Sequence, residues 1–293
     1  MTQAAPVLRQ QAEQLAANLP PLLVAAKRVA ATVAQGVHGR RRVGQGETFW
    51  QFREYEPGDP PQLIDWRQSA KTDRVFVREL EWEAAQSVWI WRDVSASMAW
   101  RSATSLPEKR NRADLLTLAL GVLLLAAGER VALLGSPMRL VSGRTGLTQL
   151  VNMVERERES EADLPKVLPL PRNAQLVLIG DLLAPLDEIN RVVRDYAARG
   201  VKGHLLQILD PAEEQLPYHG RVRFAGLEGD DDWLLPRVDS VRADYQARLN
   251  AHCEGLAAIA RIAGWSYARH RTDNPPQTAL LALHATLSQS PIR

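Results

Sequence analysis

Short apolar runs alternate with segments of helical periodicity from residue 86 onward, and this alternation limits the possible folds more than any other feature. The runs are rich in branched and aromatic residues, as strands are; they are SVWIWRD (87–93), RVALLG (130–135), AQLVLIGD (174–181), HLLQILD (204–210) and WSYARH (265–270). The periodic segments predict helices over residues 111–128, 145–159, 186–200 and 241–263, and a last helix after Pro275-Pro276. Continuous apolar strands are typical of a parallel sheet buried on both faces. We therefore predict an α/β fold, with a mostly parallel sheet and helices on both of its faces.

Two further patterns add detail to this region. The run MRLVS (138–142) predicts a strand that forms a hairpin with the strand before it. Residues 211–239 predict an irregular insertion, with a short strand over 221–225.

The chain before residue 86 has a different character. Residues 7–34 are Ala-rich and predict a helix that Pro20-Pro21 interrupts, and the basic run HGRRR (38–42) predicts a solvated linker. Six of the eight tryptophans lie between Trp50 and Trp100, and the alternation over 75–80 predicts a strand. We expect three parts: an N-terminal helical arm with a basic linker (1–45), a Trp-rich β segment packed on the main domain (46–84), and the α/β domain (85–293).

Charge and apolar content exclude several classes of protein. The net charge of +2 provides no global field that would attract nucleic acid or a membrane surface. The single cysteine, Cys253, excludes an intramolecular disulfide framework and is expected to be a packed thiol. The start of the chain lacks a signal-peptide pattern, and the longest apolar run (115–128) is shorter than the roughly 20 residues of a membrane span. We expect a soluble, cytoplasmic protein that neither binds nucleic acid nor inserts into a membrane.

A cluster of oxygen-bearing side chains follows the first predicted strand. Asp93, Ser95 and Ser97 stand at positions i, i+2 and i+4, which point the same way in an extended chain. One carboxylate and two hydroxyls are hard ligands, suited to Mg²⁺, Mn²⁺ or Ca²⁺. The simpler interpretation is a helix N-cap made by Ser97 or Asp93.

Two later features favour the cation site. Asp181 ends another predicted buried strand, and Thr145 and Thr148 precede a predicted helix. Ligands of open α/β sheets bind beyond the carboxyl ends of the strands, at the point where strand order reverses. Asp93 and Asp181 would lie side by side there if their two strands are neighbours.

These residues resemble two related patterns. Asp93, Ser95, Ser97, a downstream threonine and Asp181 look like the metal-ion-dependent adhesion site of von Willebrand A domains. The segments FREY (52–55), PGD (57–59) and IDWRQSA (64–70), with the ending WSYARHRTDNPPQTALLALHATLS, resemble the bacterial family called domain of unknown function 58, over residues 40–290.

The resemblance implies a von Willebrand A-like (Rossmann-like) fold with sheet order 3-2-1-4-5-6, and frequent genetic association with MoxR-type AAA+ ATPases. It also implies a site for Mg²⁺ (or Mn²⁺ or Ca²⁺) whose ligands are Asp93, Ser95, Ser97, Thr145 (with Thr148 as the alternative) and Asp181. Two residues depart from the pattern. Leu182 stands where many von Willebrand A domains have glycine, and Arg92 stands where an apolar residue is commoner; a swing of Arg92 toward Asp93 would compete with the metal.

The function that follows is a non-catalytic protein-interaction module, an adaptor or co-factor protein of a MoxR-type ATPase, in which an acidic side chain of the partner completes the coordination of the cation. A Mg²⁺-dependent phosphoryl hydrolase is the second hypothesis, but such enzymes usually have D-x-D-x-T, and Ser95 replaces the second acid. A third is a metal-free scaffold in which Arg92 pairs with Asp93 and the Trp-rich segment is the working surface. His270 and Asp273 are expected to be structural.

Overall fold

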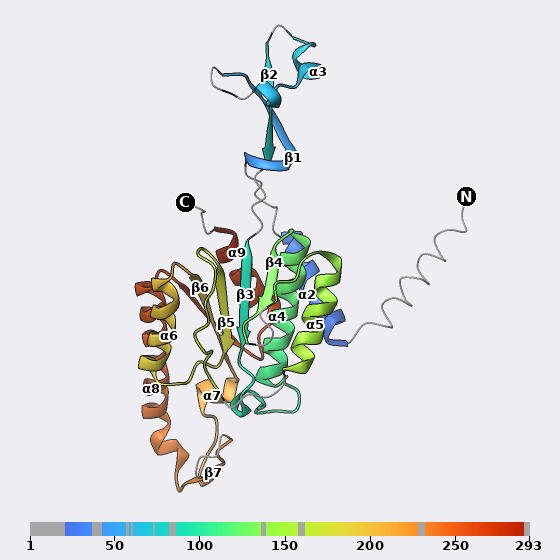
Figure 1. Cartoon of the computed structure of the whole chain (residues 1–293). Helices are drawn as coiled ribbons and strands as arrows, with labels where there is room; N and C mark the ends of the chain where they lie inside the picture. Colours follow the sequence, from blue (N-terminus) through green and yellow to red (C-terminus); the bar gives the residue numbers. More distant parts are fainter. Residues whose placement is uncertain are drawn as a thin grey trace, which may run out of the picture. The chain divides into compact units, whose positions relative to one another are not determined.

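The computed structural model describes residues 21–36, 43–56, 59, 61–72, 74–81, 86–135, 139–157, 162–227 and 232–289. Within these residues two compact units are distinguished, one falling within Met1–Gly36 and Gln86–Arg293 and the other within Val37–Ala85 (Figure 1). The first part of the predicted 7–34 helix and the basic run 38–42 lie outside the described residues.

A parallel sheet forms the centre of the large unit. Within the described residues it has five strands in the order β4-β3-β5-β6-β9. The strands are β3 (Ser87–Arg92), β4 (Arg130–Leu133), β5 (Gln175–Gly180), β6 (Lys202–Leu209) and β9 (Ser266–Arg271). All four pairings are parallel, so the predicted parallel α/β sheet is confirmed. Strand order reverses at β3, whose neighbours are β4 and β5.

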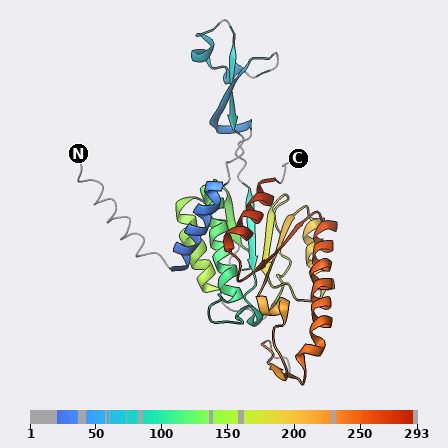
Figure 2. The ribbon, with the colours of Figure 1, turned by 180° about the vertical axis from the view of Figure 1, so that it is seen from behind.

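Helices cover both faces of this sheet (Figures 1 and 2). On one face lie α4 (Lys109–Ala126) and α9 (Pro276–Gln289), with α2 (Pro21–Gly36) packed against both, and α5 (Gly143–Arg156) beside α4 and β4. On the other face lie α6 (Leu186–Ala198) and α8 (Val238–Ile262). The packing of α2 makes this helix part of the large unit.

The predicted strand over 138–142 is reduced to one antiparallel bridge, between Val141 and Val131. Residues 136–138 lie outside the described residues. The bridge confirms the antiparallel pairing of this stretch with the strand before it, but the described residues 139–142 form no longer strand, and Gly143, with φ 63°, turns the chain directly into α5.

The predicted insertion contains regular elements. Residue 211 begins α7 (Pro211–Gln215), and a two-stranded antiparallel hairpin follows, formed by β7 (Val222–Phe224) and β8 (Trp233–Leu235). The short strand expected over 221–225 is confirmed. The last strand of the hairpin leads into α8.

The small unit is built on two antiparallel strands, β1 (Val43–Glu54) and β2 (Phe76–Glu81). The strand predicted over 75–80 is confirmed as β2. Between the two strands lie η1 (Pro61–Leu63) and α3 (Trp66–Ser69). Asp65 caps α3 by accepting a hydrogen bond from Gln68 N at 2.8 Å, and the Trp66 side chain is exposed.

Candidate functional site

The carboxyl ends of β3 and β5 place two aspartates side by side. Asp93 follows β3 directly, and its backbone N–H donates to the Ile179 carbonyl at 2.8 Å, which extends the β3–β5 ladder by one residue. Asp181 follows β5 in the same way. Both side chains are buried. The parallel register of two neighbouring strands therefore delivers two carboxylates to one edge of the sheet.

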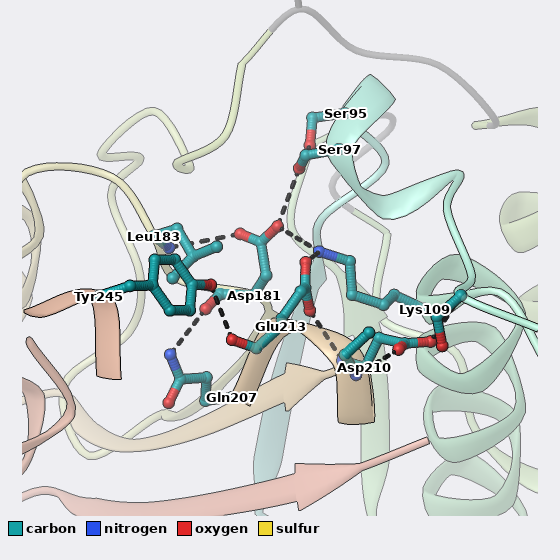
Figure 3. Close-up of polar contacts among 11 residues, drawn as sticks. Ser95, Ser97, Lys109, Asp181, Leu183, Gln207, Asp210, Glu213 and Tyr245 are labelled. Carbon is teal, nitrogen blue, oxygen red and sulfur yellow. Dashed lines mark hydrogen bonds and ion pairs between the residues drawn. The ribbon is translucent and has the colours of Figure 1, made fainter. Parts of the chain in front are cut away.

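The two serines complete the group. Asp93 Oδ1 accepts a hydrogen bond from Ser95 N at 2.9 Å, which folds the chain into η2 (Ala96–Met98). Ser95 Oγ and Ser97 Oγ lie 3.0 Å apart, and Ser97 Oγ donates to Asp181 Oδ2 at 2.9 Å (Figure 3). Ser95 occupies the N-cap position of η2, but its side chain makes no capping hydrogen bond. Of the two residues in the simpler N-cap interpretation, Asp93 does accept a backbone N–H at the start of this turn, whereas the Ser97 hydroxyl bonds to Asp181 instead.

One oxygen of Asp93 is buried without a hydrogen bond. Among the described residues, Asp93 Oδ2 has no hydrogen-bond partner. Burial, together with the charge of Asp181, raises the pKa of Asp93 to about 7. Gly180 makes room for this carboxylate, because a Cβ at residue 180 would lie 2.8 Å from Asp93 Cβ and 3.1 Å from Asp93 Oδ2. Burying a polar atom without a partner costs free energy, so this oxygen is suited to a ligand.

Lys109 enters the same site, and the sequence patterns did not identify it. This first residue of α4 has a side chain only 1% exposed, and its Nζ donates to Asp181 Oδ2 at 2.9 Å and to Glu213 Oε1 at 2.5 Å (Figure 3). Burial lowers the pKa of Lys109, but the charges of Asp181 and Glu213 outweigh burial and raise it. One signal was available: α4 begins KRNR with no acidic residue in its first turn, against the preference set by the helix dipole. A buried cation at this position needs a carboxylate partner, and Lys109 finds two from distant segments of the chain.

The end of β6 contributes two more carboxylates. Asp210 Oδ1 accepts from Ala212 N at 2.8 Å, and Glu213 Oε2 accepts from Asp210 N at 2.7 Å, which together form a capping box at α7. Tyr245 Oη donates to the Glu213 carbonyl at 2.7 Å. Burial raises the pKa of Glu213. The spacing D-x-x-E was the signal that sequence reasoning passed over.

The structure does not bring Thr145 or Thr148 to this group. Both lie exposed on α5. The Val131–Val141 bridge is antiparallel and close to the start of β4, so α5 begins at the amino edge of the sheet. A Cβ on Gly146 would contact Leu125, which is 16 residues along α4 from Lys109, or about 24 Å at the helical rise. The prediction that Thr145 is a ligand assumed that its helix begins at the carboxyl edge of the sheet. The chain reversal after β4 instead places the start of α5 at the opposite edge.

Arg92 points away from the site. It donates to Asp114 Oδ1 on α4 at 2.7 Å and to the Val154 carbonyl on α5 at 2.5 Å. The cation beside the aspartates is thus Lys109 and not the Arg92 expected for the metal-free scaffold. Leu182 adopts a left-handed conformation, with φ 51°, at the position where the resemblance expects glycine.

The other residues considered from the sequence have packing partners. His270 lies 3.0 Å from Arg112 through its Nε2, and burial, with the nearby Arg112 charge, lowers its pKa to about 4. Asp273 pairs with Arg271. Cys253 is buried on α8, and its Sγ donates to Gln207 Oε1 at 3.3 Å.

The comparisons with known proteins identify the family. A family model described as "Protein of unknown function DUF58" matches residues 51–255. The chain belongs to this family, as the sequence resemblance predicted. A relative, the uncharacterized protein Mb1516 of Mycobacterium bovis, is 28% identical over 275 residues, covering 89% of this chain and 86% of that protein.

Two solved structures are similar at 14% identity, each covering 70% of this chain and 100% of the other. They are the conserved hypothetical protein BatB from Bacteroides thetaiotaomicron (TM-score 0.39) and an aerotolerance-related membrane protein from Bacteroides fragilis (TM-score 0.44). The description of the Bacteroides fragilis structure as a membrane protein contradicts the predicted cytoplasmic location. A similarity this distant assigns no other location to this chain. In the part of the chain that the structure describes, every helix is too short or too polar to cross a membrane.

Proposed function

We propose that this protein is a non-catalytic interaction module with a von Willebrand A-like fold, in which Asp93, Ser95, Ser97 and Asp181 hold a divalent cation. The observation that supports this most directly is the meeting of these four side chains at the strand-order reversal, with Asp93 Oδ2 buried and lacking a hydrogen-bond partner among the described residues. A cation at this point would neutralise a carboxylate that burial otherwise disfavours.

The chemistry of the donor set fits a hard cation. Among the described residues no three His, Cys, Asp or Glu side chains gather as a metal cluster, and the candidate site instead combines two carboxylates with two hydroxyls. Oxygen-only sets suit Mg²⁺, Mn²⁺ or Ca²⁺. When bound, the cation would act as an electron-poor centre that accepts one more oxygen ligand.

The proposed partner presents that ligand as an acidic side chain. The four side chains provide two carboxylates and two hydroxyls, fewer ligands than the roughly six or more oxygens that Mg²⁺ or Ca²⁺ takes, which leaves positions open for a carboxylate from another protein. The family resemblance suggests a MoxR-type AAA+ ATPase, or the client that it remodels, as the partner. A role in recognition is preferred to catalysis because Ser95 stands where a second acid would serve in phosphoryl transfer.

Affinity purification of the full chain tests the proposal. We expect an AAA+ ATPase to be retained in Mg²⁺ and lost in EDTA, and lost with Asp93→Ala in either buffer. The matched control is Asp195→Asn, which removes an exposed carboxylate on α6 and should retain the partner. Retention that is insensitive to both EDTA and Asp93→Ala contradicts the cation-dependent module.

A cation-free interaction module is the second candidate, and one contact favours it. Lys109 Nζ already bonds Asp181 Oδ2 at 2.9 Å and supplies a positive charge within the site. In that case the partner would bind without metal. Titration of Mn²⁺ into the full chain by calorimetry separates the two candidates, because only the first releases or absorbs heat that disappears in Asp93→Asn.

A further inference from the structure

The position of Lys109 relative to the candidate cation site carries a further inference. Its ammonium group lies between a carboxylate of the site, Asp181, and a carboxylate outside it, Glu213 (Figure 3). Asp181 directly follows β5, and Glu213 lies in α7, which follows the neighbouring strand β6. Lys109 is as buried as a core residue. Its positive charge is therefore stabilised by these two carboxylates and not by water.

On the basis of the proposed function, we propose that the Lys109 ammonium competes with a divalent cation for Asp181, and that Lys109 thereby sets the affinity of the site for the cation. In the cation-free protein Lys109 neutralises Asp181. When a cation binds, Lys109 gives up Asp181 and remains paired with Glu213.

Glu213 makes this exchange physically reasonable. A buried ammonium that lost its only carboxylate would be strongly destabilising. Lys109 instead has a second acceptor at 2.5 Å, and the other oxygen of Glu213 is fixed by Asp210 N at 2.7 Å. The Tyr245 hydroxyl holds the Glu213 backbone from α8. Glu213 is therefore a rigid second position for the ammonium.

The competition between Lys109 and the cation concerns one oxygen of Asp181, Oδ2, to which Ser97 also donates. Asp181 Oδ2 accepts hydrogen bonds from both Ser97 Oγ and Lys109 Nζ, each at 2.9 Å. Asp181 Oδ1 accepts a longer bond from Leu183 N, at 3.3 Å. A cation that uses Oδ2 must displace the ammonium, whereas Ser97 can turn its hydroxyl oxygen toward the cation.

Lys109→Met is the direct test, because methionine keeps the apolar stem and removes the charge. The full-length wild type, Lys109→Met and Asp93→Asn are titrated with Mn²⁺ by calorimetry. Loss of a unit positive charge a few ångströms from the site should tighten Mn²⁺ binding by on the order of tenfold or more. Combining Lys109→Met with Asp93→Asn should abolish the gain, which shows that the ion binds at this site.

A double-mutant cycle with Glu213→Gln tests the mechanism of exchange. Glu213→Gln leaves Asp181 as the only carboxylate for Lys109, so it should weaken Mn²⁺ binding in the wild-type background. In the Lys109→Met background it should have a much smaller effect. Equal effects in both backgrounds overturn the exchange, because Glu213 would then act only through its own charge.

The outcomes separate this inference from the proposed function. Equal or weaker Mn²⁺ binding by Lys109→Met, with measurable binding by wild type, overturns the role of Lys109 and keeps the cation site. Binding by Lys109→Met alone supports the role of Lys109 and overturns a cation-dependent function of the wild type. If neither wild type nor Lys109→Met binds Mn²⁺, both the role of Lys109 and the cation site are overturned. If Lys109→Met is poorly folded without cation, Mn²⁺ should raise its melting temperature more than that of wild type, and failure to do so overturns the inference.

Discussion

Asp93 carries the clearest consequence at the scale of single residues. Its pKa is raised to about 7 by burial and by Asp181, from an ordinary value of 3.8. The folded protein therefore binds this proton more tightly than the unfolded chain does, and the free energy of unfolding falls as pH rises from about 4 to 7. Asp93→Asn removes the ionisable group. In EDTA, we expect the variant to gain stability relative to wild type between pH 5 and pH 8, by up to a few kcal/mol at about 1.4 kcal/mol per pKa unit.

Urea unfolding at both pH values measures this difference. Asp195→Asn is the control, since this exposed carboxylate on α6 should give the same small difference at pH 5 and pH 8. If the stability difference between Asp93→Asn and wild type is the same at pH 5 and pH 8, the pKa of Asp93 is not raised by burial to about 7.

Gly180 supports the same carboxylate through the absence of a side chain. A Cβ at residue 180 would lie 2.8 Å from Asp93 Cβ, closer than side chains approach one another. Gly180→Ala should therefore displace Asp93, lower the free energy of unfolding by about 1–3 kcal/mol, and weaken Mn²⁺ binding. Urea unfolding and calorimetry measure the two effects.

Gly146→Ala on α5 is a matched control for this substitution. Its new Cβ would meet the flexible end of Leu125 at 3.3 Å and would lie in ordinary contact with Val141 at 3.4 Å, and alanine is favoured over glycine within a helix by up to about 1 kcal/mol. We expect little change in stability and none in Mn²⁺ binding. Equal losses of stability and binding in the two variants argue against a specific contact between residue 180 and Asp93.

The short helix α7 is the element that positions Glu213. Its cap is the Asp210 side chain, which accepts from Ala212 N at 2.8 Å and, through Oδ2, from Ser102 N at 3.0 Å. Asp210→Ala should lower the free energy of unfolding by about 0.5–2 kcal/mol, as expected for loss of an N-cap. Asp210→Asn keeps one acceptor oxygen and should lose less. Urea unfolding checks the order; a loss in Asp210→Asn as large as in Asp210→Ala shows that the cap is not the cause.

Elements with continuous burial were the ones the sequence predicted well. The runs that became β3, β5 and β6 are mostly apolar and are buried along nearly their whole length, because helices cover both faces of the sheet. Their pattern is therefore independent of which helix lies where. The placement of α5 was not predictable in this way. It depends on one chain reversal after β4, and that reversal moved Thr145 to the far edge of the sheet.

The site was predictable only as far as strand ends define it. Asp93 and Asp181 follow apolar strands, and the neighbouring positions of β3 and β5 bring them together. Lys109 and Glu213 reach the site from helix starts, where a charged residue ordinarily contacts water. Their pairing depends on tertiary contacts between segments about a hundred residues apart, which local patterns do not encode.

At the scale of the whole molecule, the chain order of the two units has a testable consequence. Residues 37–85 form a unit inserted between α2 and β3, whereas α2 packs on α4 and α9 within the large unit. Replacing residues 37–85 by a flexible Gly/Ser linker of ten residues should therefore leave the large unit folded. The shorter connection changes loop-closure free energy by only about 1 kcal/mol.

Circular dichroism and urea unfolding of this linker variant measure the outcome, and its Mn²⁺ affinity should match that of the full chain. Deleting residues 1–85 is the contrasting variant. It also removes α2, whose buried face consists of Leu23, Ala26, Val29, Ala30 and Val33. Because this apolar face covers α4 and α9, we expect that deletion to be destabilised by several kcal/mol relative to the linker variant. Loss of cooperative unfolding in the linker variant itself would show that the large unit depends on residues 37–85 for its fold.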